Sequence, residues 1–322
     1  MHLSFICAAA HLALPASGQL LADGSAWHGG IGSSQVFALP AGSRPTFTWA
    51  LPRPPRRGAQ QEAFELEIFD QSGRSVWASG TLKSATAKFV YPSTAPILLP
   101  QRTYTWSVSA STSTSSTTAQ SSFHIAPADA DWHGVPWLGD TNLNVYRTSF
   151  RLRGAAMDAA ARVQLYVCGL GFSVATLNGR SLNTLTTAPW TNSAKINGFL
   201  SVDITHALRR AGQAAEEGSN TLVVALGNGW RARDAFPVRD PADRGVAKDG
   251  AYPRMLRVMI VASLPDGSIQ TVMHTGDGSW EAARGPVTYD SVYNGEAHDA
   301  RIAEAVFAPS SSSWVQAPTA SG

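Results

Sequence analysis

Between residues 36 and 126, short runs of alternating apolar and polar residues are separated by turn-forming stretches. Residues 63–70 (AFELEIFD) place Phe64, Leu66 and Ile68 on one face and two glutamates on the other, as expected for a half-buried strand. Similar strands are predicted at residues 46–51, 76–77, 88–91, 102–110 and 123–126. Several short strands at this spacing predict a β-sandwich.

Tyr104 lies at the start of one of these strands, after the sequence LLPQ, and alternates with Trp106. This position is typical of a tyrosine corner, in which the hydroxyl bonds to the backbone a few residues upstream. The alternative is an ordinary strand aromatic. The corner predicts a fibronectin III-like domain at residues 35–126, in which the Ser/Thr-rich residues 111–122 form a hairpin connection.

A linker at residues 127–131 leads into a second domain, which we place at residues 131–308. Within it, residues 165–180 (LYVCGLGFSVATLNGR) predict a core strand pair around a glycine turn, followed by the hairpin turn Asn178-Gly179. Further strands are predicted at residues 146–152, 199–208 (ending in a short helical turn), 221–226, 257–263, 269–274 and 287–294.

The remaining stretches of this half lack periodicity. Residues 231–250 are charged and turn-rich and predict a long loop or insertion, while residues 309–322 are interpreted as a tail that is disordered or truncated from residue 310. Because helix signals are few throughout, the expected fold class is all-β.

Composition excludes two classes of partner. Charged residues make up only 15% of the chain and the formal net charge is +2, so no nucleic-acid partner is expected. The arginines within residues 53–57 stand beside prolines and fit a solvated loop. No apolar run reaches the length of a transmembrane helix, so no membrane partner is expected either.

The N-terminus carries a candidate targeting signal. Residues 3–14 form an apolar run, and small residues follow at positions 16–18. We therefore expect residues 1–18 to be a secretory signal peptide, although the usual basic region is missing; a cytoplasmic location is the alternative. Cys7 lies in this segment, and Cys168 in a strand is expected to be a small buried residue, so no disulfide is predicted.

None of the common catalytic motifs occurs in the sequence. The eight histidines show no metal-ligand spacing such as HExxH, and there is no GxSxG elbow and no P-loop. Glu296 and Asp299 form a nearby carboxylate pair, but both lie on one short segment, which we expect them to anchor structurally. The sequence therefore predicts no catalytic residue.

Several stretches of the second half, taken together, resemble a known family. They are LYVCGLGFSVATLNG at 165–179, APWTN at 188–192, VDITHAL at 202–208, NTLVVALGNGW at 220–230 and GDGSWEAARGPVTYDSVYNGEAHDAR at 276–301. In order and spacing they are similar to the N-terminal accessory domain of bacterial-type α-L-rhamnosidases (glycoside hydrolase family 78). RPTFTWAL, VWASG and YTWSV in the first half resemble the fibronectin-type domain that precedes it, so the resemblance covers residues 44–318.

The resemblance implies a galactose-binding-like jelly-roll β-sandwich after the fibronectin III-like domain. In that family, an acid and a base carboxylate of an (α/α)6 barrel that follows this segment carry out inverting hydrolysis. The 322 residues show no helical-pair repeat and no such acidic cluster. We therefore expect the chain to be inactive alone, with the catalytic barrel as its missing partner.

The resemblance also implies a binding role, because some rhamnosidase accessory domains bind rhamnose with the help of calcium. A sugar site needs oxygen atoms for hydroxyls or Ca²⁺, and an aromatic ring for the C–H face of the sugar. The loop candidates are Asn178, Trp190, Asn192, Asn228, Trp230 and Arg231. Alternatively, Asn178 and Asn228 hold turn geometry and the tryptophans pack in the core or at its rim. No calcium ligand is assigned by the sequence.

Interdomain or structural roles are assigned to Tyr293, Glu296, Asp299 and Arg301 within the segment similar to the family's YxGExxDAR ending. The first hypothesis is thus the non-catalytic N-terminal portion of a rhamnosidase, which supports or targets hydrolysis of terminal α-L-rhamnosides and binds a rhamnose-containing glycan. A free-standing carbohydrate-binding module and a structural spacer protein are the alternatives.

Overall fold

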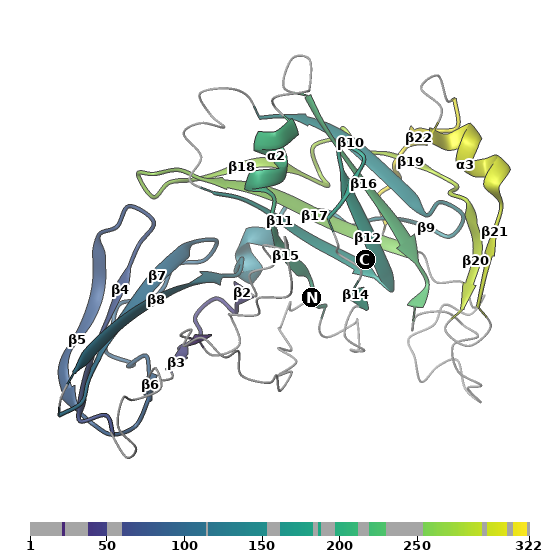
Figure 1. Ribbon diagram of the computed structural model, residues 1–322. Helices are drawn as coiled ribbons and strands as arrows, with labels where there is room; N and C mark the ends of the chain where they lie inside the picture. The colour runs from purple at the N-terminus through teal and green to yellow at the C-terminus, as the bar shows by residue number, and fades with distance from the viewer. Residues whose placement is uncertain are drawn as a thin grey trace. The chain divides into compact units, whose positions relative to one another are not determined.

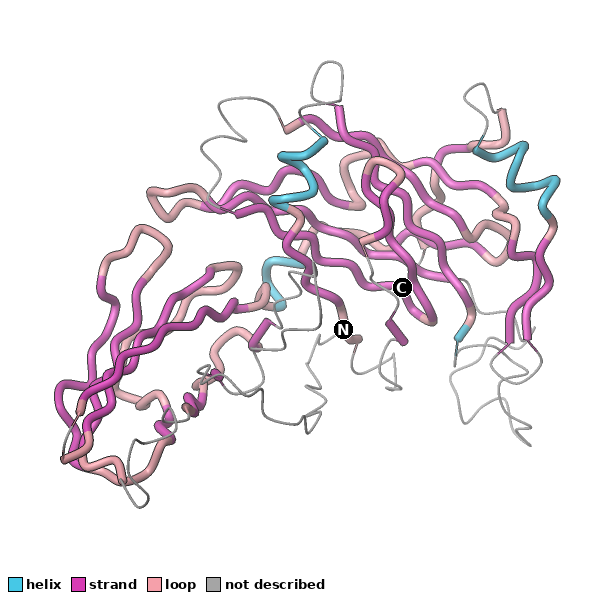
Figure 2. The backbone as a smooth tube through the Cα atoms, in the orientation of Figure 1, coloured by secondary structure: helices cyan, strands magenta, loops and turns pink. Residues whose placement is uncertain are grey.

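The computed structural model describes residues 21–22, 38–49, 60–113, 115–152, 162–182, 186–187, 197–211, 219–229, 254–291, 295–307 and 312–320. These residues fall into two compact units (Figures 1 and 2). The N-terminal unit contains the described residues up to Asp131 together with Ser263–Ile269, and the C-terminal unit contains the others from Trp132 onward. Among the described residues, no helix is long and apolar enough to cross a membrane.

The N-terminal unit is a β-sandwich, as the alternating pattern predicts. One sheet has the strand order β2-β8-β7-β4-β5 and the other the order β1-β3-β6. β2 pairs with β8 in parallel, and the other pairs that join these strands are antiparallel. The strands are β1 (Leu21–Ala22), β2 (Ala38–Leu39), β3 (Thr46–Thr48), β4 (Ala63–Phe69), β5 (Ser75–Lys83), β6 (Lys88–Val90), β7 (Thr103–Ser111) and β8 (Ser116–Ile125).

Large aromatic side chains form the core of this unit. In β7 every second residue is buried, so that Trp106 is fully enclosed while its sequence neighbours are half-buried. The Trp106 ring packs against Phe47 with a centroid distance of 4.9 Å, and Phe47 packs against Phe123 at 5.7 Å. The period-two pattern of the sequence is therefore also the packing pattern of the core.

The tyrosine corner is confirmed. Tyr104 is buried, and its hydroxyl accepts a hydrogen bond of 2.8 Å from the backbone N–H of Leu99, five residues upstream. The hydroxyl of Tyr91 binds the same loop by donating to the carbonyl of Pro96 over 2.8 Å. The two tyrosines together fix the loop that leads into β7.

The C-terminal unit is a second β-sandwich. One sheet runs β13-β12-β16-β10-β19-β22 with β14 paired to β12, and the other runs β15-β11-β17-β18 with β9 paired to β17. The strands are β9 (Leu138–Asp140), β10 (Val145–Arg151), β11 (Arg162–Leu170), β12 (Phe172–Leu177), β13 (Arg180–Ser181), β14 (Thr186–Thr187), β15 (Leu200–Asp203), β16 (Ser219–Gly227), β17 (Arg254–Ser263), β18 (Ile269–His274), β19 (Glu281–Ala283) and β22 (Val315–Gln316).

Three further elements accompany the sandwich in the described part of this unit. They are the two-stranded ribbon of β20 (Val287–Ser291) and β21 (Gly295–His298), and the helices α2 (Thr205–Ala211) and α3 (Ala300–Phe307). A 3-10 turn, η1 (Asp129–Trp132), precedes β9. The expected all-β class is thus correct, with only short helices.

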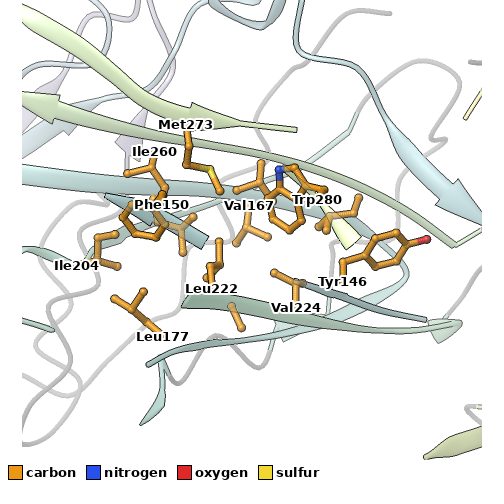
Figure 3. Packing of buried hydrophobic residues seen from close by; sticks show 14 of the residues in the cluster. Tyr146, Phe150, Val167, Leu177, Ile204, Leu222, Val224, Ile260, Met273 and Trp280 are labelled. Atoms are coloured by element: carbon orange, nitrogen blue, oxygen red, sulfur yellow. The ribbon is translucent and has the colours of Figure 1, made fainter. Parts of the chain in front are cut away.

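The core between the two sheets is mainly aliphatic. Leu222 and Val224 of β16 face Val167 of β11 and Ile260 of β17, with Trp280 beside them (Figure 3). β11 is buried on both faces, because the rings of Trp132 and Phe199 help to cover its outer side. Cys168 lies on that outer side as a buried thiol that forms no disulfide among the described residues and donates to the carbonyl of Gly198 over 3.0 Å.

The structure corrects one prediction for residues 165–180. β11 and β12 do not pair with each other, because they belong to different sheets. The chain crosses between the sheets at Gly171, whose φ of +112° suits glycine. The hairpin turn that follows is as predicted: Asn178 (φ +51°) and Gly179 (φ +74°) connect β12 to β13.

The expected disordered tail is the second difference, because the described residues 312–320 form an ordered strap. β22 pairs with β19, and Ala317 N–H donates to the carbonyl of Trp280 over 2.9 Å. Further along, the Pro318 carbonyl accepts from Gly139 N–H of β9 over 3.0 Å. The strap therefore joins the edges of both sheets.

Candidate functional site

Segments that carry predicted sugar-binding residues leave one end of the C-terminal unit. Phe172, the first residue of β12, pairs with Thr187 of β14 and with Gly227 of β16. Residues 188–192 follow Thr187 directly, and Asn228 follows Gly227. The two segments therefore start from adjacent positions of one sheet.

Glycines allow the turns at this end to interlock. A Cβ atom added to Gly171 would lie 2.2 Å from the carbonyl oxygen of Gly227 and 2.7 Å from that of Asn228. Gly229 (φ +52°) packs less closely but still tightly, because its added Cβ would lie 3.1 Å from the carbonyl carbon of Gly171. The GLG and GNG sequences are thus explained by backbone contact, for which a side chain would leave no room.

Asn228 is held by the β20–β21 ribbon. Its backbone N–H donates to Oδ1 of Asp290 over 2.6 Å, and its side-chain Nδ2 donates to the Asp290 carbonyl over 3.0 Å. No group of the described residues hydrogen-bonds to its Oδ1. The side chain therefore fixes the turn, and its Oδ1 is an acceptor that no other described residue uses.

Asp290 also faces Arg254, the first residue of β17. Oδ2 of Asp290 lies 3.7 Å from Nη2 of Arg254, and the two side chains are only 13% and 12% exposed. Nη1 of Arg254 donates to the Thr141 carbonyl over 3.1 Å. A largely buried carboxylate and guanidinium thus lie between β20, β17 and the turn after β16.

Tyr146 of β10 extends its hydroxyl away from the apolar cluster (Figure 3). Burial, with the charge of Asp140 as a smaller cause, raises the pKa of Tyr146 well above its ordinary value. The phenol consequently stays protonated and remains a neutral hydrogen-bonding group at any physiological pH.

Asn178 directly follows Leu177, the last residue of β12, whereas Phe172 is its first, and these two ends of the strand lie about 17 Å apart. Its Oδ1 accepts from Thr221 N–H over 2.8 Å, and its Nδ2 donates to Oδ1 of Asn220 over 2.9 Å. This side chain is used by the sheet, and the structure does not bring it together with Asn228. Trp190, Asn192, Trp230 and Arg231 lie outside the described residues.

The segment assigned to interdomain or structural roles begins a helix. Asp299 caps α3, since its Oδ1 accepts from Arg301 N–H over 3.1 Å. The guanidinium of Arg301 returns to the same carboxylate with bonds of 2.9 and 2.7 Å, which lowers the pKa of Asp299 to about 2. Glu296 is exposed on β21, and Tyr293 lies outside the described residues.

Sequence reasoning missed Asp290 and Arg254. Asp290 was visible only as a residue of the strand predicted at 287–294, and Arg254 was assigned to no predicted element. Asn228 and Asp290 are 62 positions apart, and no local pattern connects them. Within the described residues, no group of three His, Cys, Asp or Glu side chains could hold a metal ion.

Comparison with known families and proteins gives consistent matches. Residues 158–321 match the family described as the α-L-rhamnosidase N-terminal domain, and residues 40–128 match the Rha78A-like N-terminal immunoglobulin domain. An α-L-rhamnosidase of Formosa agariphila is 25% identical over 294 residues, covering 80% of this chain and 29% of that protein. One of Streptomyces avermitilis is 28% identical over 186 residues, covering 56% of this chain and 16% of that protein.

Solved structures share the fold. The α-L-rhamnosidase from Dictyoglumus thermophilum matches with a TM-score of 0.69 and 20% identity, over 95% of this chain and 34% of that one. The Streptomyces avermitilis α-L-rhamnosidase complexed with L-rhamnose matches with a TM-score of 0.63 and 14% identity, over 89% of this chain and 43% of that one. This chain therefore spans less than half the length of each of these proteins.

Proposed function

The chain belongs to the family of the α-L-rhamnosidase N-terminal domain, and we propose that it is the non-catalytic N-terminal portion of such a glycoside hydrolase. In this proposal it supports or targets the hydrolysis of terminal α-L-rhamnosides by binding a rhamnose-containing glycan. The observation that carries the proposal is the family match over residues 158–321, which corresponds to the N-terminal region of α-L-rhamnosidases.

The proposed sugar site is the end of the C-terminal unit at the GNG turn. Support comes from the adjacent starts of residues 188–192 and of the segment after Gly229, and from the acceptor left on Asn228. A sugar hydroxyl can donate to this acceptor, and an aromatic ring can cover the C–H face of the sugar. Trp190, Asn192, Trp230 and Arg231 are proposed as ligand contacts on these segments, and calcium as an auxiliary ion.

The proposed support role falls to the β20–β21 ribbon and α3. All four residues of β21 are exposed, and an isolated two-stranded ribbon is only marginally stable in water. We assign this surface, with Glu296, Asp299, Arg301 and Tyr293, to contact with the catalytic barrel of the longer relatives. An extracellular location is part of the proposal and depends on residues 3–14, which lie outside the described residues.

Calorimetric titration with L-rhamnose, with and without EDTA, tests the sugar site. Asn228→Ala and Trp230→Ala are expected to weaken binding at least tenfold, because each removes a proposed direct contact. Asn178→Ala is the matched control, since it removes an asparagine at the opposite end of β12 and should leave affinity unchanged. Absence of heat at millimolar rhamnose would reject the sugar site and favour the spacer alternative.

Catalysis is tested separately with an aryl α-L-rhamnoside. The expected result is no turnover by this chain, because in this proposal the acid and base carboxylates belong to the catalytic barrel of the longer relatives. Release of the aryl group above the uncatalysed rate would refute the non-catalytic assignment.

A further inference from the structure

We infer that Arg257 positions a clasp formed by two segments of the C-terminal unit. One is the entry segment, residues 132–139, by which the chain enters this unit, and the other is the end of the strap, residues 318–320. Together they cover the outer side of β11. Only the consequence rests on the proposed function, in which the catalytic barrel follows the strap and the clasp fixes where the chain leaves toward it.

Arg257 of β17 holds the entry segment by two kinds of contact. Its Nε donates to the carbonyl of Val135 over 2.6 Å, and its Nη2 donates to the carbonyl of Trp132. The guanidinium carbon also lies 5.3 Å from the ring centroid of Trp132 and 5.6 Å from that of Trp137, which is within the range of cation–π attraction. A planar guanidinium can bind two carbonyls and stack on indole rings at once, which an ammonium group cannot do.

The entry segment is also fixed by the turn after β18. The buried Thr275 donates its hydroxyl to the carbonyl of Pro136 over 2.7 Å. A Cβ atom added to Gly276 would lie 2.6 Å from Cδ of Pro136 and 3.0 Å from the carbonyl oxygen of Gly134, so glycine is needed for this close approach. The segment is therefore bound both to β17 and to the end of β18.

The strap end is hydrogen-bonded to this same segment. Ala320 N–H donates to the carbonyl of Trp137 over 2.8 Å, and Gly139 N–H donates to the carbonyl of Pro318 over 3.0 Å. The carbonyl of Trp137 therefore holds the strap end, while the ring of Trp137 lies beside the guanidinium of Arg257. Through this one residue, the position of the entry segment sets the position of the strap end.

The clasp covers the thiol of Cys168 on β11. Trp137, Cys168, Leu170 and Met255 form one buried apolar cluster, and Ala320 packs against it. Cys168 is only 1% exposed, so a reagent can reach its sulfur only after a local opening of the structure. The labelling rate of this thiol therefore reports how often the clasp opens.

Thiol labelling with dithionitrobenzoate tests the role of Arg257. The chain has two cysteines, so Cys7→Ser in every protein leaves Cys168 as the only thiol. Arg257→Met is expected to raise the labelling rate at least about tenfold, because it removes hydrogen bonds from a charged group to two carbonyls and the rate follows the population of the open form. Arg257→Lys keeps the charge but not the planar fork, and should give an intermediate rate. An unchanged rate in Arg257→Met would overturn the positioning role.

Arg162→Met is the matched control. The side chain of Arg162 is 16% exposed, lies on the same strand as Cys168 and binds Asp203 over 2.8 Å. Its replacement should lower the melting temperature without faster labelling at a temperature where the variant is folded. Labelling as fast as in Arg257→Met would show a general loosening of the unit and would overturn the clasp.

Gly139→Ala reaches the clasp from the strap side and serves if Arg257→Met does not fold. Its added Cβ would lie 2.9 Å from the carbonyl oxygen of Arg254 and 3.1 Å from Cβ of Ala320, so the strap end must shift. Labelling of Cys168 should again become faster. An unchanged rate in this variant would show that the strap end does not cover the thiol.

Amide exchange distinguishes one clasp from two independent segments. Ala320 N–H and Gly139 N–H should exchange about tenfold faster in Arg257→Met, in step with the thiol, while Val224 N–H in the core strand β16 keeps its rate. Faster labelling with unchanged exchange at Ala320 would refute the clasp. Neither measurement needs a sugar or a barrel, so failure of the proposed function would appear in the rhamnose titration and leave both results valid.

Discussion

The two units enclose their cores by different means. In the N-terminal unit, aromatic rings such as Phe47 and Trp106 point inward from strands whose burial alternates residue by residue. The C-terminal unit has an aliphatic core, and its edges are joined by contacts between distant residues, such as Ala317 with Trp280 and Asn228 with Asp290. Contacts that follow from the alternating pattern of each strand hold the first unit together, whereas contacts between residues far apart in the sequence close the second.

The two kinds of contact serve different purposes: burying an apolar face stabilises a unit, whereas contacts between distant residues place the side chains of a site. An alternating strand needs only its own sequence to present an apolar face. A site at the end of a sandwich needs turns from several strands to be held in register, which requires buried polar groups with specific partners. The C-terminal unit has these groups at the GNG turn, and the proposed ligand contacts follow the same turn.

Replacing one buried tryptophan in each unit should have the largest effect. Trp106 and Trp280 are 0% and 1% exposed, and each change to alanine should cost about 3–5 kcal/mol of unfolding free energy. We expect Trp106→Ala to lower only the N-terminal transition in a calorimetric scan, and Trp280→Ala only the C-terminal one. A fall of both transitions in either variant would show that the units unfold as one body and would remove the basis of the comparison.

Substitutions in the strap, residues 312–320, test whether contacts between distant residues stabilise the C-terminal unit. Ala317 is buried, and Ala317→Asn should cost about 1–3 kcal/mol by burying an amide without partners. Thr319→Asn is the control, because the side chain at 319 is exposed and the same amide can remain in water there. Urea unfolding followed by tryptophan fluorescence gives both values. Equal stability of the two variants would mean that the strap does not close the sandwich in solution.

Sequence reasoning predicted features that depend on neighbouring residues and missed contacts between distant ones. It predicted most strands of the N-terminal unit, the corner at Tyr104 and the Asn178-Gly179 turn, because each depends on residues that are neighbours along the chain. It was wrong for residues 116–122, which it assigned to the hairpin connection, because they belong to strand β8 and pair with β7. It paired β11 with β12 wrongly, since an apolar strand before a glycine turn has the same pattern whether the chain returns to its own sheet or crosses to the other. It also missed the strap and the Asp290 contacts, whose partners lie far away in sequence.

The tyrosine corner predicts a smaller effect, confined to the N-terminal unit. Tyr104→Phe keeps the buried ring but leaves Leu99 N–H without its acceptor, which should cost about 1 kcal/mol. The C-terminal transition of the same calorimetric scan is the internal control and should not move. An unchanged N-terminal transition would show that water replaces the hydroxyl without cost.

The smallest effect concerns Asp299, a local contact within the C-terminal unit. Its pKa is lowered to about 2, chiefly by the hydrogen bonds from Arg301, against an ordinary value of 3.8. The folded-state pKa lies below the unfolded one, so the contact stabilises the fold above about pH 4 and this contribution is lost as pH falls toward 2. Carboxyl chemical shifts measured by NMR from about pH 1.5 to about pH 6 should show this titration, since this range includes both pKa values.

Arg301→Met should return the midpoint of the Asp299 titration toward 3.8. Arg301→Lys should give an intermediate midpoint, because lysine keeps the charge but cannot form two parallel hydrogen bonds with the carboxylate. A midpoint near 3.8 in the unaltered chain would show that this exposed pair, unlike the buried pair of Asp290 and Arg254, does not persist in water.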